Sequence, residues 1–122
     1  MNLHEERLSG KHIFKGRVID LEVDQIRLPD GHDSIREVIN HPGGVAIAAL
    51  NERDELLMVR QFRYPFHSVL LELPAGKLEP GEVPLEAAKR EQKEETGTQA
   101  EEYISLGKCY ATPAYCTEQI HL

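Results

Sequence analysis

The sequence has little that would place the protein in a membrane or on a nucleic acid. None of its apolar runs is long enough to span a bilayer, and the first residues, MNLHEERLSG, are too polar for a secretion signal. Basic residues are scarce, because 14 Lys and Arg stand against 21 Asp and Glu, which gives a net charge of -7. Nucleic acids are bound through basic surfaces, so we expect neither a nucleic-acid partner nor a membrane partner.

Cysteine is also scarce. The two cysteines, Cys109 and Cys116, form no metal-binding or redox motif, and the six histidines show no ligand spacing. Without an export signal, the expectation is free thiols in a cytoplasmic protein. A chain of 122 residues is expected to form a single domain, residues 1–122, with enough buried surface for a core.

Acidic residues, by contrast, are concentrated in one short segment. Pro84 can open a helix there and Gly97 can close it. Between them, Glu91, Glu94 and Glu95 are three and four residues apart and share one helix face, where each like-charge pair costs about 0.2–0.5 kcal/mol. The negative end of the helix dipole adds to this repulsion. A bound divalent cation would turn this repulsion into attraction, so the pattern indicates a metal site. A solvated charged face is the alternative interpretation.

The chemistry of the ligands narrows the choice of cation. All of them are oxygen atoms, which favours Mg²⁺ or Mn²⁺ over zinc. Mg²⁺ usually takes a few carboxylates and shares its other positions with water and substrate phosphates. The turn at Glu79-Pro80-Gly81 brings Glu82 towards the helix as one more carboxylate.

This segment, GKLEPGEVPLEAAKREQKEETGT, resembles the Nudix hydrolase signature G-x5-E-x7-R-E-U-x-E-E-x-G-U, in which U is a bulky apolar residue. At the two U positions the sequence departs from the signature and carries Gln92 and Thr98, where the family normally packs the helix and its exit against the sheet. The fixed positions that match are Gly76, Glu82, Arg90, Glu91, Glu94, Glu95 and Gly97.

The resemblance implies an α/β (α+β) Nudix fold, a mixed β-sheet sandwiched between helices, with one helix expected in this chain. It divides the chain into an N-terminal β-region at 1–42 and a catalytic core at 43–122. On that fold a further strand and helix follow the position of Leu122, so we expect a chain that is truncated at its C-terminus, with a natural short form of the domain as the alternative. Alternation and apolar runs predict strands at 12–28, 34–40, 45–50, 56–62 and 69–73, and extended segments at 103–110 and 118–122. The first strand is expected to have a bulge or register change before Ile26. The strands at 45–50 and 56–62 are expected to be buried.

Features outside the signature resemble the ADP-ribose pyrophosphatase subfamily. Pro113 lies fifteen residues beyond Thr98, and the segments REVINHPGGVAIAAL and VRQFRYP agree with that subfamily. The resemblance implies Mg²⁺-dependent hydrolysis of the pyrophosphate bond of ADP-ribose to AMP and ribose 5-phosphate. The alternatives are a broader nucleoside-diphosphate-sugar hydrolase, a non-catalytic ADP-ribose-binding module, and an incomplete piece that folds only as an oligomer.

The same resemblance assigns roles at the metal site. Glu91 and Glu95 are the expected main ligands, Glu94 serves a second or third ion, and the carbonyl of Ala75 adds a backbone ligand. Arg90 is expected to pair with a carboxylate and orient the helix. Glu118 matches the loop glutamate that acts as the base for the attacking water, and an ordinary surface acid is the alternative.

The resemblance assigns the substrate contacts to four further residues. Arg63 is expected to clamp a phosphate or the terminal ribose with its planar fork, and Glu82 to support the metal shell. Arg36 and Glu37 lie where relatives contact the adenosine half, often across a homodimer interface formed by the N-terminal strands. For this pair, an ion pair on the surface of a sheet is an equally good interpretation.

Overall fold

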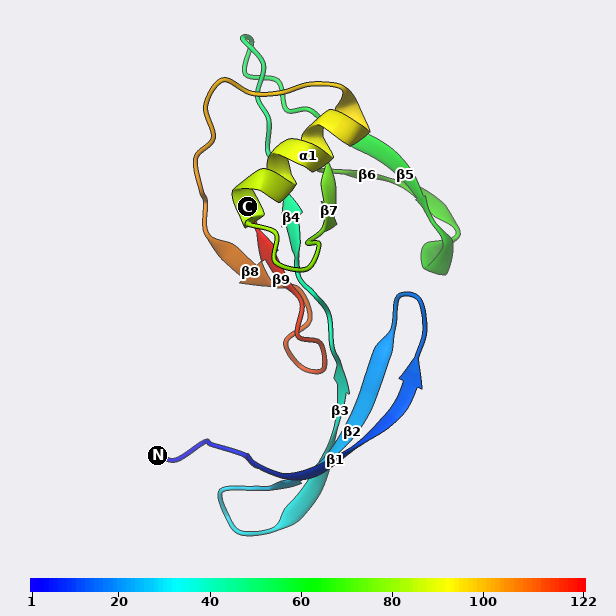
Figure 1. Ribbon diagram of the computed structural model, residues 1–122, viewed down its shortest axis with the longest axis vertical. Coiled ribbons are helices and arrows are strands. Elements are labelled where there is room, and N and C mark those ends of the chain that lie inside the picture. The colour runs from blue at the N-terminus through cyan, green and yellow to red at the C-terminus, as the bar shows by residue number, and fades with distance from the viewer. The chain divides into compact units, whose positions relative to one another are not determined.

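The computed structural model describes residues 1–122 and divides them into two compact units. Unit 1 comprises Met1–His41 and Tyr110–Glu118, and unit 2 comprises Pro42–Cys109 and Gln119–Leu122. Figure 1 labels the strands and the one α-helix. None of the helices is long and apolar enough to cross a membrane.

Unit 1 is built on a three-stranded antiparallel sheet in the order β1-β2-β3. The strands are β1 (Glu6–Lys15), β2 (Asp20–Arg27) and β3 (Asp33–Ile39). The segment Tyr110–Glu118 joins the end of β3 through two backbone hydrogen bonds. The N–H of Ile39 donates to the Tyr115 carbonyl at 2.7 Å, and the N–H of Thr117 donates to the Ile39 carbonyl at 2.9 Å.

The single extended stretch predicted at 12–28 is wrong in this unit. The chain turns at residues 16–19, where the N–H of Gly16 donates to the Ile19 carbonyl at 2.7 Å, and two strands result. Strand β1 begins as early as Glu6 and is exposed along its whole length, so it has no apolar alternation to reveal it. The expected register change before Ile26 is present, because Arg7 pairs with Ile26 whereas Ser9 pairs with Gln25, so the extra residue lies in β1. A second irregularity lies between His12 and Phe14.

Unit 2 contains a mixed four-stranded sheet in the order β7-β4-β9-β8. The central strand β4 (Gly44–Ala46) pairs antiparallel with β7 (Ala75–Lys77) and parallel with β9 (Gln119–His121), and β8 (Lys108–Tyr110) lies at the edge. The helix α1 (Pro84–Thr96) lies across β4 and β7, as Figure 1 shows. Val45, Ile47 and Ala87 form the buried core between sheet and helix. This mixed α+β arrangement is the expected fold class.

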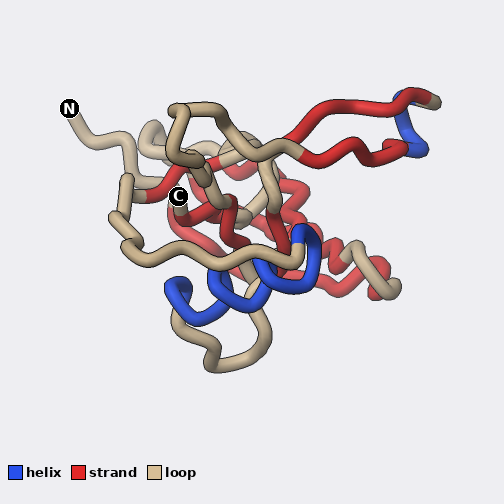
Figure 2. Tube along the Cα trace, turned by 90° about the horizontal axis from the view of Figure 1, so that it is seen from above, coloured by secondary structure: helices blue, strands red, loops and turns tan.

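A separate two-stranded hairpin extends unit 2. It consists of β5 (Val59–Arg63) and β6 (Ser68–Glu72), and the short 3₁₀ helix η1 (Tyr64–Phe66) closes its tip (Figure 2). The prediction of a buried strand at 56–62 is wrong, because Phe62 is 55% exposed and β5 pairs only with β6. The prediction at 45–50 is too long, since β4 ends at Ala46, although Val45 and Ile47 are buried as expected.

Candidate functional site

The acidic helix begins and ends where the sequence predicted. Pro84 occupies its first turn, where the missing N–H leaves no intrahelical bond unmade. Gly97 follows Thr96 with φ of 68°, and its N–H donates to the Lys93 carbonyl at 2.9 Å. A side chain at this left-handed position would be strained, so glycine fixes the end of the helix directly beyond its acidic turns.

The guanidinium of Arg90 joins three carboxylates of this segment. Its Nε and Nη2 atoms donate to the two oxygens of Glu82, each at 2.9 Å. Its Nη1 atom donates to Glu91 at 2.8 Å and to Glu94 at 3.2 Å, and Nη2 also reaches the Lys77 carbonyl at 3.3 Å. One cation therefore ties the loop, the end of β7 and the helix together.

These contacts shift the ionisation of both partners. The hydrogen bonds from Arg90, followed by one from the N–H of Glu79, lower the pKa of Glu82 to about 2. The same ion pair, together with the contact to Glu91, raises the pKa of Arg90. Both oxygens of Glu82 are thus engaged inside the protein, and Glu82 anchors Arg90 in this structure.

The lowered pKa of Glu82 predicts a loss of stability in acid. Its ordinary value is 4.5, so the ion pair stabilises the fold fully above that pH, and the contribution is lost as the pH falls towards 2. We expect the melting temperature of the natural chain to fall more steeply over this range than that of Glu82→Gln, measured by circular dichroism. Glu101→Gln, on an exposed residue, should follow the natural chain. A Glu82→Gln offset that does not change with pH would contradict the prediction.

Glycine is required at position 76 because the Glu91 carboxylate lies against it. A methyl group on Gly76 would clash with all three carboxylate atoms of Glu91. The neighbouring residue Ala75 donates its backbone N–H to Glu95 Oε2 at 3.3 Å. Strand β7 therefore meets the acidic face of α1 at two adjacent residues, and the structure brings Gly76, Ala75, Glu91 and Glu95 together.

Arg63 lies in the same unit, at the end of β5. It forms a two-pronged ion pair with Glu72, with Nε to Oε1 at 2.7 Å and Nη2 to Oε2 at 2.6 Å. The hydrogen bond to Glu72 raises the pKa of Arg63, and the Glu95 carboxylate adds a smaller contribution of the same sign. Sequence reasoning missed Glu72, although a carboxylate within the apolar run 69–73 was a signal that it has a partner.

Three of the predicted residues belong to unit 1. Glu118 Oε1 lies 3.8 Å from Nε2 of His41. Arg36 donates to both carboxylate oxygens of Glu5, and Glu37 is exposed on β3. Arg36 therefore takes part in an ion pair on the surface of the sheet, the alternative interpretation, with Glu5 as the carboxylate.

The residues at the helix fit a hard divalent cation by their chemistry. Three carboxylates share one helix face, and Gly76 leaves room for the carboxylate of Glu91. In this arrangement Glu91 and Glu94 contact Arg90, Glu95 accepts from Ala75, and no group of three His, Cys, Asp or Glu side chains converges on one point. The carboxylates thus have internal partners, and Glu94, whose side chain is 60% exposed, is the most accessible of those that contact Arg90.

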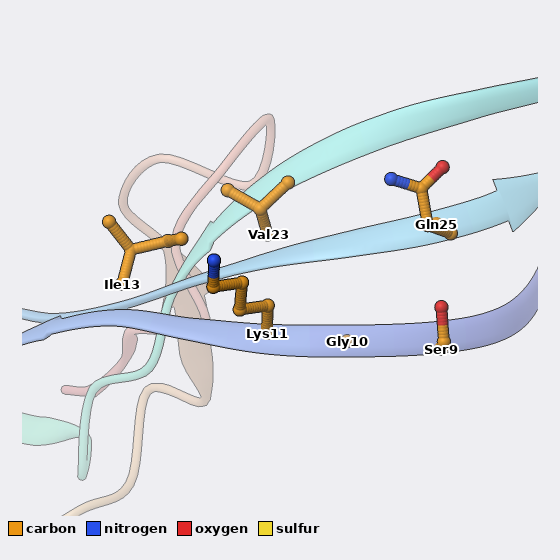
Figure 3. A pocket seen from close by; sticks show the side chains of 6 residues that line it. All are labelled: Ser9, Gly10, Lys11, Ile13, Val23 and Gln25. Carbon is orange, nitrogen blue, oxygen red and sulfur yellow. The ribbon is translucent and has the colours of Figure 1, made fainter.

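Unit 1 carries a depression of about 230 Å³ between β1 and β2. Its wall has one charged side chain and no acid, so it offers neither a metal site nor a general base. Figure 3 shows the six residues that line it: Ser9, Gly10, Lys11, Ile13, Val23 and Gln25.

Comparison with known proteins identifies the family. The NUDIX domain model matches residues 40–121, which include the whole acidic helix and its loop. The chain belongs to the Nudix family. The model of the nucleoside diphosphate sugar hydrolase N-terminal domain matches residues 5–39, the part that carries β1, β2 and β3. Nudix hydrolases generally use a divalent metal ion, which agrees with the donor set on α1.

Individual relatives agree with this assignment. The chain is 41% identical over 121 residues to an ADP-ribose pyrophosphatase of Bacillus subtilis (strain 168), covering 99% of the chain and 65% of the relative. It is 42% identical over 118 residues to a methanol dehydrogenase activator of Bacillus methanolicus, covering 97% and 64%. A crystal structure of an ADP compounds hydrolase superposes with a TM-score of 0.88 at 25% identity, covering 99% of this Nudix chain and 66% of its own. The chain therefore spans somewhat less than two thirds of these relatives.

Proposed function

We propose that the protein hydrolyses the pyrophosphate bond of ADP-ribose in a Mg²⁺-dependent reaction, releasing AMP and ribose 5-phosphate. The observation that carries the proposal is the convergence of Arg90, Gly76 and Ala75 on the acidic face of α1. The ADP-ribose pyrophosphatase of Bacillus subtilis supports the choice of substrate, as does a second one from Mycobacterium tuberculosis (strain ATCC 25618 / H37Rv), which is 36% identical over 118 residues and covers 96% of the chain and 57% of the relative.

Glu91 and Glu95 are proposed as the main metal ligands, with Glu94 and the carbonyl of Ala75 completing the protein donors. Bound Mg²⁺ or Mn²⁺ supplies charge neutralisation of the pyrophosphate and favours ionisation of the attacking water. Arg90 keeps the carboxylates together and fixes the loop to the helix, through the contacts described above. The reaction adds one water across the P–O–P bridge, so that each product keeps one phosphate.

The remaining residues are proposed to act on the substrate and on the water. Glu118 accepts the proton of the attacking water, and Arg63 contacts a phosphate or the terminal ribose. The Glu95 carboxylate influences the pKa of Arg63, which supports a position of Arg63 near the acidic helix. Arg36 and Glu37 are proposed to contact the adenosine half, and a homodimer through the N-terminal strands stays a prediction.

The direct test is hydrolysis of ADP-ribose by the purified chain with Mg²⁺. We expect AMP and ribose 5-phosphate in equal amounts by ion-exchange chromatography, and we expect chelation with EDTA to stop the reaction and added Mg²⁺ to restore it, because the carboxylates alone cannot neutralise a pyrophosphate. Boiled protein is the matched control. Undiminished turnover in EDTA would contradict the role of the metal.

A broader nucleoside-diphosphate-sugar hydrolase is the second candidate. It is favoured by the match of residues 5–39 and by a GDP-mannose pyrophosphatase of Yersinia enterocolitica that is 36% identical over 94 residues. The same assay with GDP-mannose and dinucleoside polyphosphates separates the two candidates. Faster turnover of either compound than of ADP-ribose would replace the first candidate by the second.

A further inference from the structure

A glutamine is buried in the acidic helix at a position where the Nudix signature has an apolar residue. Gln92 is 2% exposed and lies beside Glu91 in the sequence. Burial of an amide without partners costs several kcal/mol, so a glutamine at this depth needs hydrogen bonds that an apolar residue would not need. The partners are present, and they come from the segment through which the chain leaves the helix.

The amide of Gln92 is hydrogen-bonded at both ends. Its Oε1 accepts from the hydroxyl of Tyr103 at 2.8 Å, and its Nε2 donates to Thr98 Oγ1 at 3.1 Å. The Tyr103 oxygen in turn accepts from the N–H of Ala100 at 3.2 Å. The hydroxyl of Thr96 lies 2.7 Å from that of Thr98 and donates to the backbone carbonyl of Gln92 at 2.5 Å.

One arrangement of protons satisfies all of these groups, which we call the Gln92 network. Tyr103 donates to Gln92 and accepts from Ala100. Thr96 donates to the backbone carbonyl of Gln92, which leaves Thr98 to donate to Thr96 and to accept from the side-chain amide of Gln92. The two departures from the signature, Gln92 and Thr98, therefore contact each other and form one compensated exchange rather than two separate defects.

The Gln92 network stabilises the C-terminal turns of α1, the least stable part of the helix. The last turns of a helix fray, and here like charges and the negative end of the helix dipole also repel one another. Gln92 and Thr96 flank Glu94 and Glu95, and Tyr103 and Thr98 belong to the exit segment. Directional hydrogen bonds fix the rotation of these turns, which an apolar contact would fix less strictly.

We propose that Gln92 is a positioning residue for the carboxylates of α1, acting through Thr98 and Tyr103. The proposal rests on the proposed function for the identity of the cation, because Glu91 and Glu95 are its ligands there. Gln92 itself touches neither metal nor substrate. Its role is to set the direction in which the acidic face of the last two turns points, as partners behind metal ligands generally do.

The test compares Gln92→Met, which keeps the length of the side chain, with Gln99→Met, the same change at an exposed glutamine in the exit segment. Tyr103→Phe is the second variant, because it removes only a hydroxyl and keeps the ring beside Lys89, whose Nζ is 5.7 Å from the ring centroid. Hydrogen exchange of the backbone amides of 91–96 is measured on the metal-free proteins. Mn²⁺ affinity is then measured by electron paramagnetic resonance at a temperature where every variant is folded.

We expect about tenfold faster exchange and about tenfold weaker Mn²⁺ binding in Gln92→Met and Tyr103→Phe, with Gln99→Met like the natural chain. Unchanged exchange in both variants would overturn the proposal, and so would faster exchange with unchanged Mn²⁺ affinity, since the network would then serve stability alone. A natural chain that bound no Mn²⁺ would refute the proposed function instead, while the exchange comparison would still decide whether the network fixes the acidic turns.

Discussion

Replacement of Glu95 by glutamine is expected to lower kcat/KM for ADP-ribose about a thousandfold, the largest effect of any single change in the chain. The amide removes the negative charge of a proposed main ligand and offers a much weaker oxygen to a hard cation. The amide oxygen can still accept the N–H of Ala75, the hydrogen bond that the Glu95 side chain makes in the structure, so the fold should persist. Steady-state kinetics with saturating Mg²⁺ and a melting curve measure the two effects separately.

The matched control is Glu86→Gln, which makes the same chemical change in the first turn of the same helix. Glu86 lies 3.8 Å from Lys89 on the surface, and such exposed pairs contribute little, so its activity should match that of the natural chain. Equal activity of Glu95→Gln and Glu86→Gln would remove Glu95 from the metal site.

Gly76→Ala is expected to lower kcat/KM about a hundredfold or more while costing only about 1 kcal/mol of stability. The added methyl group would clash with the carboxylate of Glu91, which is the free end of a flexible side chain. The carboxylate can therefore swing away, but it then leaves both strand β7 and its 2.8 Å hydrogen bond to Arg90. Kinetics and chemical denaturation of the variant test this combination of a large catalytic effect with a small loss of stability.

A double-mutant cycle isolates the contact. In a chain that already carries Glu91→Ala, the substitution Gly76→Ala has no carboxylate to displace and should change kcat/KM no further. Additive losses in the two variants would mean that Gly76 acts on the backbone of β7 rather than through Glu91.

The acidic helix could be predicted because its determinants are local. Pro84 and Gly97 act on neighbouring residues of the backbone, and the spacing of the glutamates fixes which of them share a face. The fold class could be predicted from the same segment, because the Nudix signature is specific enough to imply the fold of its family, including the mixed sheet. For Arg90 the sequence predicted a carboxylate partner but not which one, because its contact with the Glu82 oxygens depends on the path of the loop.

Features that depend on distant pairing were not predictable from local pattern. Strand β1 is exposed on an edge and shows no alternation. The run 56–62, which begins with apolar residues, leads into β5, where Phe62 is 55% exposed. Apolar composition indicates burial only when another element covers the strand, and β5 has only β6 beside it. The Gln92 network was not predicted either. A polar residue at a core position indicates a loss of packing unless its hydrogen-bond partners are known, and these partners depend on the path of the exit segment.

The position of Arg90 has a consequence for how the protein folds. Three of the acidic side chains around it already share a counter-ion that the chain itself carries. A nascent molecule can therefore assemble this helix and loop before any inorganic ion reaches it. If the proposed function is correct, scarcity of magnesium would then stop the reaction without unfolding this part of the chain.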